Sequence, residues 1–319
     1  MLLPPTPAAL RRAAAALKRG EPVAFPTETV YGLGANALDP EAVRRIFEAK
    51  GRPDDNPLIV HVSGLPMVRK LVKELPPQAR ALAARFWPGP LTIVLPKRRN
   101  VPDIVTAGLP TVAVRVPDHP VALALIEAAG VPIAAPSANR SGRPSPTRAA
   151  HVAADFPGLL VLDGGPARHG LESTVVALGD PPRVLRLGAI PVEELRTVLP
   201  GLVVATKARA RAESPGMRHR HYAPARTLVL FRRSRTAALR EALAADPKAL
   251  LLCADADAPL FPGRRPVKLG GTPAQIAHGL FDALRTQRRG SVLLAYALPR
   301  RGLLRAVMDR LERAATRIV

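Results

Sequence analysis

The sequence contains little cysteine and few aromatic residues. One of its 319 residues is cysteine, so no disulfide can form within the chain. That residue, Cys253, ends an apolar run from 249 to 253 and is most simply a core residue. A single cysteine fits a reducing compartment. Phe, Tyr and Trp together number 11, so side chains on which nucleic-acid bases stack are scarce.

Long apolar runs are also missing. No stretch approaches the roughly 18–20 apolar residues of a membrane-spanning helix. The first ten residues, MLLPPTPAAL, place prolines where a secretory signal needs an apolar stretch. We therefore expect a cytoplasmic protein. The pattern G-x-x-x-x-G-K-[ST] does not occur, which excludes a P-loop.

Acidic residues are few relative to basic ones. The chain has 47 Lys and Arg against 25 Asp and Glu, a formal net charge of +22. Residues 1–200 carry +7 of this charge and residues 201–319 carry +15, so the composition changes near residue 200. Such an excess predicts affinity for polyanions, whether nucleic acid, nucleotide or a membrane surface. The 39 Arg and 36 Pro residues leave open a compositional bias with no binding role.

The order of apolar runs predicts an α/β protein. The length favours two domains, and short apolar runs bounded by Pro and Gly alternate with capped helical segments. Strands are expected at 22–25, 58–62, 91–95, 112–116, 131–135, 159–162, 174–178 and 184–187, then at 227–231, 249–253 and 291–295. Helices are expected from 7 and from 40, at 66–74, 77–85 and 191–198, then at 235–245, 273–285 and 302–316. We expect one α/β sheet domain over residues 1–200 and a smaller parallel-sheet domain over residues 227–319.

Residues 201–226 interrupt this pattern and are expected to link the domains. From 207 to 235 the chain has nine Lys or Arg and a single acidic residue, Glu213. A connection of this length is usually functional or a linker. Its two histidines, His219 and His221, have no Cys or acidic partner nearby and are a weak metal signal, so no metal ligand is assigned.

A dinucleotide fingerprint is the first candidate motif, and its context argues against it. Residues 32–37 match G-x-G-x-x-A. The fingerprint should join a strand directly to a helix. Here the polar segment 26–31 precedes it, and the next helix begins only near Asp39.

Polar loops after the expected strands are better candidates. Thr27 and Thr29 follow the strand at 22–25, where α/β proteins place ligand-binding loops. Lys50 and Arg52 end a helix and are each followed by a residue that turns the backbone, a pair suited to gripping phosphate. Each has an ordinary explanation as well: a polar loop bonded to its own backbone, and cations that suit a helix dipole. His61, in a strand, would by itself be a structural histidine.

An arginine between valines is a further candidate. Arg115 lies in an expected buried strand and must therefore face an anion. Residues alone leave open whether that anion is an internal carboxylate or a carboxylate of a ligand. A loop rich in serine, with Ser137, Asn139 and Ser145, offers hydroxyl and amide donors to an anion, or is simply a Ser/Pro turn.

Taken together and in order, the motifs resemble the YrdC-type threonylcarbamoyl-AMP synthases. The strings that carry the resemblance are FPTETVYGLG at 25–34, KGRPDDNPLIVH at 50–61, FWPGPLT at 86–92, VAVRVPDHP at 112–120, PIAAPSANRSGRPSPT at 132–147, STVV at 173–176 and SPGMRHRHYAP at 214–224. The last string marks the long, two-domain form. The resemblance implies an open, twisted YrdC-like α/β domain followed by a smaller Rossmann-like domain.

The same resemblance implies the chemistry. Members condense L-threonine, bicarbonate or CO2, and ATP into threonylcarbamoyl-AMP and pyrophosphate, a nucleotidyl transfer that expects Mg²⁺ with the ATP. A separate transferase then passes the group to tRNA, so tRNA and that transferase are expected partners. In long members the linker closes over the pocket, and residues 201–226 are expected to act as such a lid.

The resemblance also assigns residues. Lys50 and Arg52 are expected to act on the phosphates as catalytic cations. The expected threonine-binding residues are Thr27, Thr29, His61, Arg115 and Ser173. The expected ATP-binding residues are Lys50, Arg52, Asn56, Thr111, Ser137, Asn139, Ser145, Arg186 and Tyr222. No side chain is assigned as a general base.

Two other functions remain as alternatives. A basic surface without catalysis would bind double-stranded RNA or tRNA through phosphates, but that activity does not need Arg115 or the Ser/Thr loops. A related carbamoyl-transfer domain of hydrogenase maturation would bring Cys-rich zinc fingers, which one cysteine excludes. The basic stretch 285–290 and Asp309 depart from the family pattern, so they put the role of the second domain in doubt.

Overall fold

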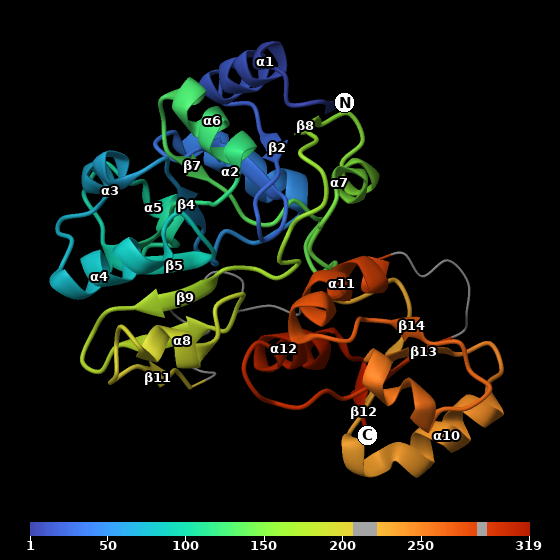
Figure 1. Ribbon diagram of the computed structural model, residues 1–319. Coiled ribbons are helices and arrows are strands. Elements are labelled where there is room, and N and C mark those ends of the chain that lie inside the picture. The colour runs from blue at the N-terminus through green and yellow to red at the C-terminus, as the bar shows by residue number, and fades with distance from the viewer. Residues whose placement is uncertain (207–221, 286–291) are drawn as a thin grey trace. The chain divides into compact units, whose positions relative to one another are not determined.

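The computed structural model describes residues 1–206, 222–285 and 292–319 (Figure 1). The chain forms two compact units. The first comprises residues 1–141, 145–168 and 172–219, and the second comprises residues 142–144, 169–171 and 220–319. Each unit contains a β-sheet with helices, which confirms the predicted α/β class.

The first unit is built on a mixed sheet of eleven strands in the order β1-β8-β2-β3-β7-β4-β6-β5-β9-β10-β11. The strands are β1 Leu2–Leu3, β2 Val23–Phe25, β3 Gly32–Asn36, β4 Ile59–His61, β5 Leu91–Pro96, β6 Thr111–Arg115, β7 Ile133–Ala134, β8 Leu160–Leu162, β9 Thr174–Ala177, β10 Arg183–Arg186 and β11 Val203–Val204. The helices are α1 Pro7–Lys18, α2 Pro40–Lys50, α3 Leu65–Leu71, α4 Pro77–Phe86, α5 Asp103–Thr106, α6 Pro120–Ala129, α7 Ala149–Asp155 and α8 Val192–Arg196.

Local signals set the ends of the first helices. The Thr6 hydroxyl accepts a hydrogen bond from the Ala9 amide at the start of α1, where Pro7 is the first residue. The Asp39 carboxylate accepts hydrogen bonds from the amides of Glu41 and Ala42 at the start of α2. Gly51 ends α2 with a φ of 58°, a left-handed conformation that glycine adopts without strain. These ends fix where Lys50 leaves the helix.

Helices cover both faces of this sheet. Side chains alternate along each strand, so apolar residues on both faces need a covering layer. Val23 and Phe25 of β2 pack with α1 and α6, which lie side by side (Figure 1). Ala24, between them, belongs to the opposite core, which includes Val43 and Ile46 of α2.

Strand β3 was not among the expected strands, and its residues overlap the fingerprint match at 32–37. Its sequence, GLGAN, has no β-branched residue. It forms a strand because small residues let it lie between β2 and β7. A Cβ on Gly34 would come within 2.6 Å of Ile133 Cγ2 and 2.7 Å of Phe25 Cε1, so no larger side chain fits.

The second unit has a five-stranded, fully parallel sheet in the order β14-β13-β15-β12-β16. The strands are β12 Leu228–Phe231, β13 Leu250–Cys253, β14 Val267–Lys268, β15 Leu293–Tyr296 and β16 Arg317–Ile318, and the α-helices are α10 Thr236–Ala245, α11 Pro273–Arg285 and α12 Leu304–Ala314. Two short 3-10 helices cover Arg233–Arg235 and Asp255–Leu260. Cys253 is fully buried, which confirms its expected place in a core.

The described residues contain no helix that is both long enough and apolar enough to cross a membrane.

Gly34→Ala should destabilise the first unit, because the added methyl group overpacks the contact between β3, Phe25 and Ile133. We expect a loss of about 1–3 kcal/mol. Urea unfolding followed by the fluorescence of the single tryptophan, Trp87, measures this unit alone. Gly201→Ala is the control, because nothing lies within 4 Å of its added Cβ. Equal midpoints for the two variants would contradict the steric argument.

Candidate active site

Sheet pairing brings distant segments together. His61 of β4 and Arg115 of β6 lie directly opposite each other on neighbouring parallel strands. The loop after β7 returns to β3, where Ser137 forms a bridge with Gly32. Ser173, just before β9, lies beside Arg186 at the end of β10. Most of the predicted residues therefore gather in the first unit.

The two threonines form one buried hydroxyl pair. Thr27 Oγ1 and Thr29 Oγ1 are 2.8 Å apart, and Thr27 Oγ1 donates to the Val30 carbonyl at 2.6 Å. Since the Thr27 proton points to that carbonyl, the Thr29 hydroxyl is the donor within the pair. The loop is thus folded on itself, and both side chains are almost inaccessible to solvent.

Arg115 faces an internal carboxylate. Its Nη2 lies 2.6 Å from Glu28 Oε1, and both side chains are buried. Its Nε donates to the Gly89 carbonyl at 3.2 Å. Glu28 therefore supplies one counter-ion for this arginine within the chain. Neither oxygen of Glu28 has a well-aligned hydrogen bond to any residue that the structure describes.

His61 is a neutral imidazole. Its burial, and after that the positive charge of Arg115, lower its pKa to about 3. Its ring meets Phe25 edge to face, with centroids 5.9 Å apart. Nδ1 is buried and has no hydrogen-bond partner among the described residues. A buried polar atom of this kind is exceptional in proteins and marks a position that a ligand can satisfy.

Ser173 is the centre of a second network. Its hydroxyl is 2.7 Å from Thr92 Oγ1 and accepts from Arg186 Nη2 at 3.0 Å. The same guanidinium donates to the Ser173 carbonyl. Gly188 makes this approach possible, because a Cβ there would lie 2.4 Å from the Thr174 amide nitrogen.

Lys50 ties helix α2 to the serine-rich loop. Its Nζ donates to the carbonyls of Ser137 and Asn139 at 2.6 and 2.5 Å. The Ser137 hydroxyl donates to Asn139 Oδ1 at 2.5 Å, which fixes the loop locally. Arg52 donates to the Asn56 carbonyl at 2.8 Å and so closes the turn that follows α2.

Ser145 and Glu172 form a further buried contact, in which the serine hydroxyl donates to Oε1 at 2.6 Å. Backbone carbonyls, hydroxyls and carboxylates thus satisfy most of the predicted donors within the unit. Such a site is pre-organised, since few side chains must move to meet a ligand.

Two predicted residues are not part of this cluster. Thr111 begins β6, whereas Arg115 ends it, a separation of about 13 Å at the usual rise of a strand. Tyr222 lies in the second unit, where it stacks on Phe281 with centroids 5.2 Å apart and lies beneath the guanidinium of Arg310. Residues 207–221 of the expected lid, which include His219 and His221, lie outside the described residues.

Sequence reasoning missed three participants: Glu28, Thr92 and Glu172. Two of them lie inside motifs already noticed, PTET and FWPGPLT, and Glu172 directly precedes STVV. For Glu28 and Glu172 the available signal was a carboxylate within or directly before a hydroxyl-rich motif. Among the residues described, no group of three or more His, Cys, Asp or Glu side chains could hold a metal ion.

Two family models match the chain. The one described as "Telomere recombination" matches residues 15–188, and the one described as "Threonylcarbamoyl-AMP synthase, C-terminal domain" matches residues 190–316. The threonylcarbamoyl-AMP synthase of Pyrococcus abyssi is 48% identical, with 96% of this chain and 94% of that protein covered. The Bacillus subtilis protein of the same name is 44% identical, with 96% and 92% covered.

Solved structures of similar proteins have the same fold as this chain or as its first unit. The crystal structure of P. abyssi Sua5 complexed with L-threonine matches with a TM-score of 0.89 at 45% identity, over 97% of this chain and 95% of that one. E. coli YciO, at 24% identity, has a TM-score of 0.51 over 57% of this chain and 89% of that one, a likeness of fold alone.

The buried histidine should make stability depend on pH. Unfolded, His61 titrates near its ordinary pKa of 6.5, whereas in the fold its pKa is about 3. Below pH 6.5 the unfolded chain therefore binds a proton that the folded chain does not, and stability falls as the pH falls towards 3. His61→Asn should reduce that slope by one proton between pH 4 and 6, as measured by urea unfolding at Trp87. Above pH 7 the slopes should agree; identical slopes throughout would disprove the burial argument.

Proposed function

Because the chain belongs to the threonylcarbamoyl-AMP synthase family, in its long two-domain form, we propose that it condenses L-threonine, bicarbonate or CO2, and ATP. The products are threonylcarbamoyl-AMP and pyrophosphate. The protein is thus an enzyme of the nucleotidyltransferase type. The observation that carries the proposal is the buried pair of Arg115 and Glu28 beside the neutral His61.

In the first step the amine nitrogen of threonine bonds to the carbon of CO2 and loses a proton, which gives a carbamate; when bicarbonate is the source, a water molecule leaves instead. We propose that Arg115 binds the threonine carboxylate, because its guanidinium is fixed by Gly89 and Glu28. The hydroxyls of Thr29 and Ser173 and the unsatisfied Nδ1 of His61 would face the amine and hydroxyl of the substrate. A neutral imidazole suits this place, since a cation there would repel an ammonium group.

The second step transfers the adenylyl group. The carbamate oxygen attacks the α-phosphorus of ATP, and the bond to pyrophosphate breaks. This step needs placed charge more than a covalent nucleophile. Lys50 and Arg52 would supply the cations. The donors would come from Asn56, Ser137, Asn139, Ser145 and Arg186. Mg²⁺ would arrive bound to the ATP phosphates, its usual mode of binding in such enzymes.

We further propose that the product serves threonylcarbamoyl modification of tRNA through a separate transferase in the cytoplasm. A threonylcarbamoyl adenylate is a mixed anhydride and therefore an activated acyl donor, which supports such a consumer. The relatives at high identity are all named as synthases. They do not support the alternative of an RNA-binding module without catalysis.

Pyrophosphate release is the direct test. With Mg²⁺ and ATP, release should require both L-threonine and bicarbonate, and omission of either should lower it to the background of ATP alone. A coupled phosphate assay on the full chain measures this. Release that ignores threonine would refute the assignment.

Arg115→Lys should act on threonine rather than on ATP, because a lysine cannot make the two parallel bonds of a guanidinium. Loss of such a bond costs about 1.5–3 kcal/mol, so KM for threonine should rise about tenfold or more. KM for ATP should change by less than about threefold. Arg80→Lys is the control, because Arg80 is exposed on α4. An equal rise in both constants would place Arg115 outside the threonine site.

A further inference from the structure

The second unit contains a cavity of about 630 Å³ that the proposed reaction does not use. Its walls come from the segments that follow β12 and β15 and from helix α12 and strand β16. Every described residue that lines it belongs to the second unit. The volume lies within the range typical of small-molecule sites, about 300–1,000 Å³.

The cavity lies where the sheet changes direction. From β12 the chain passes through α10 to β13, on one side of the sheet. From β15, the neighbour of β12, it passes through α12 to β16, on the other side. Figure 1 shows α10 on one face of these strands and α11 and α12 on the other. Crevices at the carboxyl ends of two such strands are the usual ligand sites of open parallel sheets.

The floor of the cavity is apolar. The buried side chains of Leu230, Leu298 and Met308 line it, and Ile318, which is 44% exposed, also belongs to the lining of the cavity. Leu230 and Met308 are buried, and the Leu298 amide donates to Met308 Sδ, which holds the thioether in place. A surface of this kind favours a flat, apolar group, and sulfur contacts with aromatic rings are favourable.

The mouth of the cavity is basic. Arg232, Arg233 and Arg300 line it, against one acidic side chain, Glu312. Asp257 holds Arg233 through two bonds of 2.9 and 3.0 Å, and the guanidinium lies over the Tyr296 ring at 5.0 Å. Arg233 is therefore held in place between the ends of β12 and β15.

The other two arginines are available to a ligand. Glu312 pairs with Arg300, whose side chain stays 67% exposed. Arg232 is exposed, and its side chain makes no hydrogen bond or ion pair to any described residue. A phosphate between these two would exchange a weak surface pair for two charge-assisted contacts.

We propose that this cavity is a second binding site, for a mononucleotide, with the base on the apolar floor and the phosphate between Arg232 and Arg300. Apolar floor, basic mouth and strand-end crevice together match that chemistry. The proposal does not rest on the proposed function, because it uses no residue of the first unit.

A methyl group inside the cavity provides the readout. Of the four methionines, Met308 lines the cavity, whereas Met67 lies in the first unit. The full chain is labelled with [¹³C-methyl]methionine, and the methyl NMR signals are followed during titration with AMP. The Met308 signal should shift until it saturates, whether or not the Met67 signal shifts. Met308→Leu assigns the signal. Inorganic phosphate alone should bind at least tenfold more weakly.

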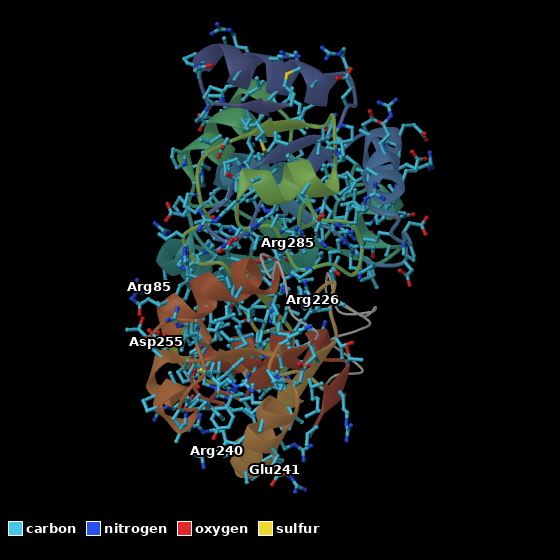
Figure 2. The ribbon with its side chains drawn as sticks, turned by 90° about the vertical axis from the view of Figure 1, so that its right-hand side faces the viewer. Arg85, Arg226, Arg240, Glu241, Asp255 and Arg285 are labelled. Atoms are coloured by element: carbon cyan, nitrogen blue, oxygen red, sulfur yellow. The ribbon has the colours of Figure 1, made fainter. Side chains whose placement is uncertain are left out.

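Variants make the test decisive. R232E/R300E should weaken the Met308 titration at least tenfold and leave pyrophosphate release within about twofold. R240E, on the exposed side of α10 (Figure 2), should change neither. If the double variant misfolds, as judged by its other methyl signals, R232A serves instead, with a loss of about threefold or more. An unmoved Met308 signal, a titration that the charge variants leave unchanged, or phosphate as effective as AMP would overturn the proposal. A failure of the synthase assay would not affect it.

Discussion

The buried pair of Arg115 and Glu28 is the interaction on which the first unit depends. A charge inside a protein must be paired, and removal of either partner leaves the other in a medium of low dielectric. To bring Glu28 to the end of β6, the segment after β2 must fold back on itself, which the Thr27 and Thr29 hydroxyls accomplish. Burial keeps His61 neutral, and the charge of the same arginine acts in the same direction. The ion pair, the loop after β2 and the histidine on β4 therefore depend on one another.

Much of the fold followed from the sequence. Apolar runs predicted β5, β6 and β9 because buried strands need continuous apolar residues, and capping residues predicted α1 and α2. Strand β3 and helix α6 were not foreseen. Strand β3 has no β-branched or aromatic residue, and its place depends on packing against Phe25 and Ile133. Helix α6 was not predicted, although Pro120 begins it and Gly130 follows its last residue.

The site was partly predictable for a similar reason. An arginine among valines announces a buried charge, but the sequence does not say which carboxylate lies near it, since Glu28 and Arg115 are 87 positions apart. Net charge was a poor guide too. Lys50 is held by two backbone carbonyls, so its place depends on loop geometry, whereas much of the positive excess lies after residue 200.

Gly188 shows how little freedom this arrangement leaves to evolution. The backbone before β9 passes so close to residue 188 that only a hydrogen atom fits between them. Any mutation there must displace the backbone at Ser173 and Thr174, and Arg186 donates to the Ser173 carbonyl. Substitutions are therefore excluded at Gly188, although this residue has no functional group of its own. A residue can be indispensable to a site through the volume that it does not occupy.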